Sequence, residues 1–382
     1  MDRHSEARER AGESGAPETD RPGAPEAGGP GALEVRAIRR LVEAMPKAEL
    51  HLHLDGSLRP ATALELARTR GIDAPRDFRT MFAALVGPDR CASQAELLRA
   101  FDLPVLLLQD AEALERVAFE LVEAKAADEV HYAEIRWAPA LHTARGLDLG
   151  AGIAAVLRGA RAAAAGTGTT TRLICTALRS HDPALNVTVA ETAARFRDQG
   201  LTGFDLAGPE EAYPDPLAHR RAFEAARAGG LRITLHAGEW GGATQVRRAL
   251  ALEPERIAHG PGAVDDDDLC AELIARGITL DLCPTSNVQA GIVSSLAGHP
   301  LARLHRRGVP VTLSTDDPTV SDVTLSEEYL RAVVEIGLSL PELWAIDRHA
   351  LEAAFADEAT LAPLRAAFAR WGAGIPDLAP TA

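Results

Sequence analysis

LTGFDLAGPEEAYPDPLAHRRAFEAARAGGLRITLHAGE, residues 201–239, contains one complete structural repeat. An apolar run at 201–207 is followed by a polar cluster, an amphipathic pattern, a glycine pair at 229–230 and a second apolar run at 231–237. Short apolar runs bounded by turn residues predict buried strands, and glycine favours a helix C-terminus because it adopts left-handed backbone conformations. The segment therefore predicts a strand, a helix and a second strand.

The same repeat recurs along the chain. Strands and helices in strict alternation predict an α/β protein with a parallel sheet, and eight such strands predict a closed (β/α)8 TIM-type barrel. In this fold the chemistry lies at the C-terminal ends of the strands. The predicted strands are residues 48–54, 130–137, 171–178, 201–207, 231–237, 256–259, 277–283 and 309–315.

One interval departs from the repeat. Residues 58–129 separate the first two strands and contain several helical patterns, which is far more chain than one crossover helix needs. Because this helical insertion follows the C-terminal end of the first strand, we expect it to arch over the barrel mouth, as a lid or as a fixed buttress. Residues 1–34 and 372–382 have little to bury, so we expect a disordered N-terminal tail and a flexible C-terminal tail around one catalytic domain, 35–371.

Composition excludes several classes of protein. The 382 residues are 46% apolar and carry a formal net charge of −15, which disfavours nucleic acids and anionic membranes as partners, because both are bound by clustered Lys and Arg. The four cysteines are scattered without Cys-x-x-Cys spacing, so neither a cysteine metal site nor a disulfide framework is predicted. No run has the apolar length of a membrane span or a signal peptide, so we expect a cytoplasmic protein that acts on a small molecule.

The first predicted strand carries two histidines in the segment ELHLHLDG, residues 49–56. Successive side chains of a strand point to opposite faces, so His51 and His53 share one face while the leucines take the other. Two imidazoles side by side can bind a metal, although such a pair also occurs as hydrogen-bonded structural histidines. The other strand ends must decide between these possibilities.

Polar side chains follow five of the predicted strands, and all of these strand ends meet at one rim of the barrel. Neutral imidazoles with one carboxylate suit Zn²⁺ or a similar first-row ion, which converts water into a nucleophile. A nearby carboxylic acid can then protonate the group that receives electrons, and Glu239 is the free acid best placed for this. The rim therefore predicts a metal-dependent hydrolase. Its residues are His51, His53, Gly208, His236, Glu239, His259, Asp316 and Asp317.

Six motifs in this order resemble the adenosine deaminase family of zinc-dependent (β/α) barrel hydrolases, over roughly residues 45–330. They are PKAELHLHLDGSL, DLAGPE, LHAGE, RIAHG, CPTSNVQ and STDDP. The resemblance implies one zinc ion per chain, bound by His51, His53, His236 and Asp316. It further implies that water adds at C6 of adenosine or 2′-deoxyadenosine and that ammonia leaves, as in purine salvage.

The resemblance also implies roles for the remaining rim residues. Glu239 would donate a proton to purine N1, His259 would orient or deprotonate the zinc-bound water, and Asp317 and the Gly208 backbone would contact the purine. Asp316 and Asp317 are adjacent, so extended backbone would direct them to opposite sides, one to the metal and one to the substrate. Because purine N7 only accepts hydrogen bonds, an aspartate that bonds to it must be protonated, which predicts a raised pKa for Asp317 in the complex.

Asp55 is the predicted determinant of the substrate. It lies two residues beyond His53, so on a continuing strand it would share the histidine face and lie further out toward the rim. There its carboxylate would accept a hydrogen bond from a 5′-hydroxyl and repel a 5′-phosphate, and relatives that act on adenine commonly carry Glu in the corresponding place. Asp55 could instead cap the helix that follows.

Three other functions are compatible with a (β/α)8 barrel that carries such a rim. A two-metal amidohydrolase with a bridging carboxylated lysine is excluded, because lysine occurs only at Lys47 and Lys125, neither at a strand C-terminus. The metal motifs do not distinguish an adenosine deaminase from a deaminase of adenine, of an adenosine nucleotide or of 6-amino-6-deoxyfutalosine. A catalytically silent barrel with a binding role has no need of the complete set that activates water. The oligomeric state is not determined by these patterns.

Overall fold

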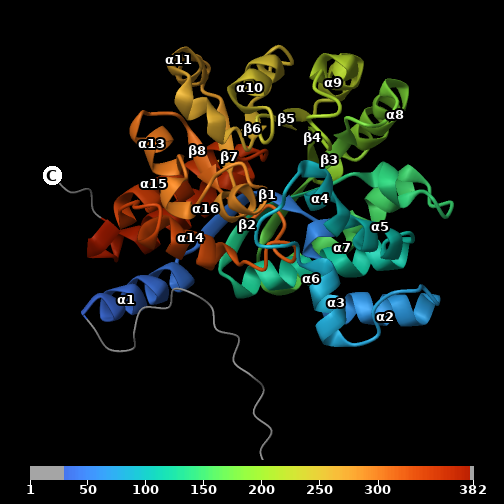
Figure 1. The fold of residues 1–382 in the computed structure, drawn as a ribbon, viewed down its shortest axis with the longest axis horizontal. Helices are drawn as coiled ribbons and strands as arrows, with labels where there is room; N and C mark the ends of the chain where they lie inside the picture. The colour runs from blue at the N-terminus through green and yellow to red at the C-terminus, as the bar shows by residue number, and fades with distance from the viewer. Residues whose placement is uncertain (1–29, 379–382) are drawn as a thin grey trace, which may run out of the picture.

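The computed structural model describes residues 30–378, and its strands form one eight-stranded sheet in the order β1 to β8 (Figure 1). All neighbouring strands are parallel. The barrel closes where Leu52 bridges to Asp316, the segment that follows β8. The predicted (β/α)8 fold is therefore confirmed. The strands are β1 (Lys47–His53), β2 (Val130–Trp137), β3 (Thr170–Leu178), β4 (Leu201–Ala207), β5 (Arg232–His236), β6 (Arg256–Ala258), β7 (Thr279–Leu282) and β8 (Val311–Leu313).

Helices surround the strands in Figure 1, and each strand is followed by at least one of them. Both faces of the sheet are buried, which explains why the strands are continuous apolar runs. Apart from the first four helices of the insertion, the helices are α1 (Pro30–Ala44), α6 (Ala111–Ala127), α7 (Leu149–Thr167), α8 (Pro183–Ala194), α9 (Arg220–Ala228), α10 (Gly242–Leu250), α11 (Asp267–Arg276), α12 (Pro284–Gln289), α13 (Leu301–Arg306), α14 (Leu325–Val334), α15 (Leu340–Ala353) and α16 (Glu358–Ala373).

The predicted insertion is helical, and its last helix, α6, is the outer barrel helix that packs on α7 and β2. The segment before it lies across the barrel mouth. The N–H of Gly87 donates to Val320 O at 2.9 Å and that of Cys91 donates to Gln289 O at 2.6 Å. The insertion therefore contacts the loops that follow β7 and β8. Its other helices are α2 (Pro60–Arg70), α3 (Phe78–Leu85), α4 (Gln94–Leu98) and α5 (Asp102–Leu107).

The folded part extends past the boundaries predicted at residues 35 and 371. Helix α1 begins at Pro30, and Val42 and Met45 at its C-terminal end are fully buried. At the other end, α16 continues to Ala373 and Leu378 packs into the core. Helix α1 thus begins before residue 35 and the packed chain continues past residue 371, while the division into one catalytic domain and two tails stays a prediction. Residues 1–29 and 379–382 of the predicted tails lie outside the described residues.

None of the helices within residues 30–378 combines the length and the apolar character needed to cross a membrane.

Candidate metal centre and active site

Three imidazoles and one carboxylate converge at the C-terminal ends of β1, β5 and β8. The Nε2 atoms of His51 and His53 lie 3.3 Å apart, and that of His53 lies 3.1 Å from Nε2 of His236. Oδ1 of Asp316 lies 3.0 Å from Nε2 of His51 and 3.3 Å from Nε2 of His53. The structure thus brings together the four residues that the family resemblance names as ligands, with their ligand atoms within 4.8 Å of one another.

These donor atoms fit a tetrahedral cation such as Zn²⁺. Zinc–nitrogen distances of about 2.0–2.1 Å separate the nitrogens of tetrahedral ligands by about 3.3 Å, close to the separations observed. Burial lowers the pKa of His51 well below its usual value and that of His53 to about 3, so both rings are neutral. Several lone pairs at such distances repel one another unless a cation lies between them. The residues present therefore fit the metal that the fold implies.

Barrel closure positions the carboxylate of Asp316. Its backbone N–H donates to His51 O at 3.1 Å, and the N–H of His53 donates to Asp316 O at 2.8 Å. Asp316 has φ +66°, so the extended backbone predicted for the two aspartates is wrong. Strand β8 ends at Leu313, and the turn that follows directs Asp316 toward the histidines. Ser286 Oγ donates to its Oδ2 at 2.8 Å.

Buried charges orient the histidine of β5. Asp205 on β4 lies 3.1 Å from Nδ1 of His236, which must carry the hydrogen because a carboxylate only accepts, so Nε2 is left free for a cation. Arg136 on β2 lies 3.6 Å from Asp205 and from Asp281. Although burial opposes ionisation, His236 and Arg136 hold the pKa of Asp205 below its usual range. The sequence analysis does not identify Asp205, Arg136 or Asp281. The signal for each is a charged residue within the otherwise apolar run of its strand.

Glu239 lies in the loop after β5, with Oε1 3.9 Å from Nε2 of His259. Burial, together with the negative charge of Asp316, raises the pKa of Glu239 to about 8. The side chain therefore carries a proton at neutral pH. A protonated carboxyl group that is mostly buried next to a group of metal-ligand side chains is suited to general acid catalysis.

One carboxylate clamps the backbone on both sides of Glu239. Glu210 accepts hydrogen bonds from the N–H groups of Gly238 at 2.8 Å, Trp240 at 2.8 Å and Gly241 at 3.0 Å. Gly238 has φ +74°, and a Cβ there would lie 2.6 Å from a neighbouring side chain, so the turn requires glycine. Glu210 belongs to the DLAGPE motif, but sequence reasoning assigned it no role.

His259 follows β6 and faces the metal cluster from the side. Its ring centroid lies 4.7 Å from that of His51, and its Nε2 lies 3.8 Å from Oδ2 of Asp316. Its backbone is left-handed, with φ +68°, and its N–H donates to Asp281 O at 2.9 Å. The loop thus turns the ring inward, in contact with the cluster but outside the tight group of four.

Asp317 packs against the glycine that ends the ELHLHLDG segment. A Cβ at Gly56 would lie 1.8 Å from Oδ1 of Asp317, so any larger residue would displace this carboxyl group. Burial, with the charges of Asp316 and Asp55, raises the pKa of Asp317 well above its usual range. Gly208 lies on the same rim, directly after β4, with φ +99°.

The continuing strand predicted for Asp55 is wrong. Strand β1 ends at His53, and Asp55 begins a single 3-10 turn, so it does not continue the histidine face. Nor does it cap the next helix, since the residue before α2 is Arg59, which makes no side-chain cap. Asp55 is buried, its Oδ1 has no hydrogen-bond partner, and burial raises its pKa to about 6. Its charge acts on Asp317, so the two carboxyl groups are neighbours.

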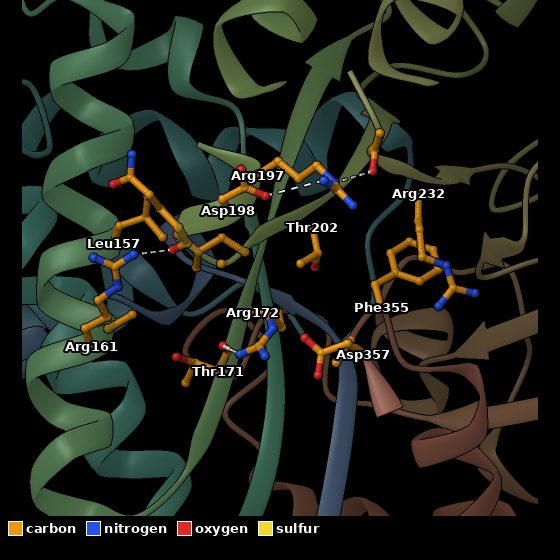
Figure 2. Close-up of a pocket in the computed structure, with 16 residues that line it drawn as sticks. Leu157, Arg161, Thr171, Arg172, Arg197, Asp198, Thr202, Arg232, Phe355 and Asp357 are labelled. Carbon is orange, nitrogen blue, oxygen red and sulfur yellow. Dashed lines mark hydrogen bonds and ion pairs between the residues drawn. The ribbon is translucent and has the colours of Figure 1, made fainter. Parts of the chain in front are cut away.

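A cavity of about 620 Å³ lies at the opposite end of the barrel, where β3, β4 and β5 begin. Four arginines are among its lining residues (Figure 2), and one of them, Arg232, pairs with Glu255 at 2.5 Å. The lining includes neither histidine nor cysteine among the described residues, and barrel enzymes react at the other end. This cavity is therefore not the reaction site. The arginines are Arg161, Arg172, Arg197 and Arg232.

Comparison with known proteins agrees with this geometry. The family model described as adenosine deaminase matches residues 46–371. An adenosine deaminase of Mycobacterium sp. (strain JLS) is 42% identical over 336 residues, which cover 82% of this chain and 91% of that protein.

Three solved structures share the fold at high coverage. An amidohydrolase from Burkhoderia ambifaria with bound Zn has a TM-score of 0.80 and 29% identity, covering 87% of this chain and 92% of that one. Adenine deaminase from Arthrobacter aurescens has a TM-score of 0.78 and 29% identity, covering 86% of this chain and 99% of that one. The N6-mAMP deaminase of Arabidopsis has a TM-score of 0.78 and 31% identity, covering 87% of this chain and 99% of that one.

The family match spans the whole barrel, and the chain covers most of the length of its relatives. It also has the histidine, aspartate and glutamate residues that a hydrolytic deaminase needs, gathered at the catalytic end of the barrel. The protein is thus a hydrolytic deaminase, and the chain belongs to the adenosine deaminase family.

Proposed function

We propose that the protein is a zinc-dependent deaminase that converts adenosine and 2′-deoxyadenosine to inosine and 2′-deoxyinosine, with release of ammonia. The observation that carries this proposal is the convergence of four ligand atoms within 4.8 Å, beside a glutamic acid whose pKa is raised to about 8. The 42% identity to a mycobacterial adenosine deaminase, against 29–31% to adenine and N6-mAMP deaminases, supports the nucleoside as substrate.

One zinc ion per chain would be bound by His51, His53, His236 and Asp316. When bound, zinc acts as a Lewis acid that makes water nucleophilic near neutral pH. The zinc-containing amidohydrolase of Burkhoderia ambifaria supports this choice of metal.

The chain's own residues bind the purine and move protons. Protonated Glu239 donates to N1, which makes C6 electrophilic, and the oxygen of water then bonds to C6. N7 only accepts hydrogen bonds, so Asp317 must be protonated to donate to it, and the raised pKa of Asp317 favours that form. The backbone of Gly208 contacts the purine from the end of β4, and His259 faces the attacking oxygen. The water gives one proton to the Glu239 carboxylate and its other proton to the amino group as the C6–N bond breaks, so ammonia leaves, the oxygen remains as the C6 carbonyl and N1 keeps the proton from Glu239.

Asp55 selects the nucleoside over the nucleotide. Its unpartnered Oδ1 is available to accept a hydrogen bond from the 5′-hydroxyl of a ribose. A 5′-phosphate would meet the like charge of the Asp55 carboxylate in a partly desolvated site. The influence of Asp55 on the pKa of Asp317 supports this role, although Asp55 lies in a 3-10 turn and not on the strand.

The test is ammonia release from adenosine, 2′-deoxyadenosine, adenine, AMP and 6-amino-6-deoxyfutalosine by purified protein of measured metal content. We expect kcat/KM for the two nucleosides to exceed that for AMP and adenine at least about 10²-fold. Asp55→Ala should lower kcat/KM for adenosine and so reduce the ratio of kcat/KM for adenosine to that for AMP. Faster turnover of adenine or 6-amino-6-deoxyfutalosine would replace the adenosine assignment, and no turnover by zinc-loaded protein would indicate a binding role instead.

A further inference from the structure

Three hydrogen bonds connect the backbone at the start of α13 to the ring of His259. The N–H of Leu301 lies 3.2 Å from Nδ1 of His299, and Nε2 of His299 lies 3.1 Å from Oδ1 of Asn287. Nδ2 of Asn287 lies 3.2 Å from Nδ1 of His259. The three side chains are at most 3% exposed, so bulk water does not replace any of these bonds.

We call this chain of hydrogen bonds from Leu301 through His299 and Asn287 to His259 the relay. The donor and acceptor of each of its bonds follow from the first one, in which Leu301 N–H donates. A backbone N–H only donates, so Nδ1 of His299 must accept. An imidazole keeps at least one N–H, so Nε2 of His299 is the donor and must face the amide oxygen of Asn287. The amide nitrogen then faces His259 and donates to its Nδ1. The ring hydrogen of His259 therefore lies on Nε2.

The opposite orientation of the Asn287 amide is excluded by the same anchor. With the amide reversed, its nitrogen would donate to Nε2 of His299 while Leu301 donates to Nδ1. Both nitrogens of His299 would then be acceptors, which no protonation state of imidazole allows.

We propose that Asn287 and His299 are positioning residues that fix the tautomer of His259, so that its Nε2–H can only donate a hydrogen bond inside the active site. This nitrogen faces the reaction side, 3.9 Å from Oε1 of Glu239 and 3.8 Å from Oδ2 of Asp316. The inference rests on the proposed function, and it selects between the two roles that the family resemblance implies for His259. A ring that presents N–H orients the attacking water and does not deprotonate it.

The first test reads the tautomer without any assay of activity. Two-bond ¹⁵N–¹H correlation spectra of histidine-labelled protein distinguish a ring nitrogen that carries hydrogen from one that does not. The signals of His259 are assigned by their loss in His259→Gln, in zinc-free and zinc-loaded protein. We expect hydrogen on Nε2 and none on Nδ1 in both; hydrogen on Nδ1 with a bare Nε2 would overturn the proposal.

The second test inverts the relay. In Asn287→Asp the carboxylate accepts from both rings, so His259 must carry a hydrogen on Nδ1 and, as a neutral ring, presents a bare Nε2. We expect the NMR signature to invert and kcat for adenosine to fall at least about 10-fold, with KM within about threefold and zinc content unchanged. Wild-type kcat together with an inverted tautomer would show that the donor is not needed.

Two variants distinguish a role of His299 in the relay from a role in packing alone. Gln in place of His299 can donate to Asn287, whereas Phe cannot, so His299→Gln should retain more kcat and more Nε2–H signal than His299→Phe. Equal loss in both would mean that the ring only packs. His349→Gln is the control, since this half-buried histidine bonds Thr279 at the start of β7, away from the rim.

Failure of the relay and failure of the proposed function give different results. If no 6-aminopurine is deaminated but His259 carries hydrogen on Nε2, the substrate assignment fails and the relay stands. If adenosine is deaminated but Nε2 is bare, the relay alone fails. The wild-type spectrum needs no substitution, so a variant that misfolds does not prevent the test.

Discussion

At the residue scale, two site residues occupy left-handed backbone that ordinarily costs a non-glycine residue about 1–2 kcal/mol. His259 has φ +68° and Asp316 has φ +66°, at the ends of β6 and β8. Each is held by a backbone bond to the adjacent strand end, from His259 to Asp281 and from Asp316 to His51. Glycine would relieve the strain but remove the functional side chain, so the surrounding barrel bears the cost.

Glu239→Gln tests the proton donor. Gln keeps the size and hydrogen bonding of the side chain but cannot transfer a proton, so kcat for adenosine should fall at least about 10²-fold. Zinc content, measured by elemental analysis, should stay at the wild-type value, because Glu239 lies outside the group of four ligands. Glu224→Gln on the exposed face of α9 is the matched control and should leave kcat unchanged. Turnover at the wild-type rate in Glu239→Gln would remove this residue from the mechanism.

At the element scale, the loops after the strands are fixed by partners from other loops. Glu210 follows β4 and bonds three N–H groups of the loop after β5, while Arg179 follows β3 and donates to His236 O at 2.9 Å. Arg179 and Glu210 also lie 3.8 Å apart. The ends of β3, β4 and β5 thus form one unit that positions His236 and Glu239.

Glu210→Gln should loosen this unit. An amide NH2 group would face a backbone N–H, so at least one of the three hydrogen bonds is lost and Glu239 moves from its position. We expect kcat to fall about 10-fold or more with zinc retained. The adjacent, exposed Glu211 provides the control, since Glu211→Gln changes the same charge without touching the clamp. Equal kinetics in the two variants would argue against the clamp.

Helix α15 contributes a buried acid whose ionisation depends on pH. Asp347 accepts hydrogen bonds from Ala48 N–H at 2.9 Å and Tyr329 O–H at 2.6 Å, and its second oxygen has no partner. Burial raises its pKa from 3.8 to about 7. A raised folded-state pKa means that the native state binds this proton more tightly than the unfolded state. Its contribution to stability is therefore complete at low pH and is lost as pH rises toward 7.

Asp347→Asn removes this titration. We expect the melting temperature of the variant, relative to the wild type, to rise by a few degrees between pH 5 and pH 8, because only the wild type loses the contribution of this proton. Thermal unfolding of both proteins at several pH values measures the difference. A difference that is constant with pH would show that Asp347 keeps the same protonation in folded and unfolded chains.

At the scale of the whole molecule, the ligand group connects β1, β5 and β8, which lie far apart in the sequence. His51 and Asp316 are separated by 265 positions, and their approach coincides with closure of the barrel. A cation bound here stabilises the closed barrel, because it binds the folded chain and finds no such site in the unfolded one.

Removal of the metal should therefore lower the melting temperature by several degrees. Dialysis against a chelator followed by calorimetry measures the loss, and added Zn²⁺ should restore both the melting temperature and ammonia release. Glu239→Gln should show the same zinc-dependent shift without activity. An unchanged melting temperature after verified loss of the metal would mean that the closed barrel is complete without it.

Local pattern predicted the elements well. The observed strands differ from the predicted residues by at most two positions at either end, because buried runs and glycine-terminated helices are local properties. The main local error was Asp55, where a turn ends the strand two residues earlier than the alternating pattern suggested. Nothing in the pattern distinguished a continuing strand from a 3-10 turn after His53.

The sequence by itself determined the barrel, its catalytic rim and the residues that gather there, because strict alternation places all strand C-termini at one end. Only the tertiary structure decided how those residues are held. Asp205 meets His236 across 31 positions, Glu210 meets Gly238 across 28, and Asn287 meets His259 across 28. Hydrogen bonds depend on distances of tenths of an ångström between segments that no sequence period relates, so their partners emerge only when the barrel closes.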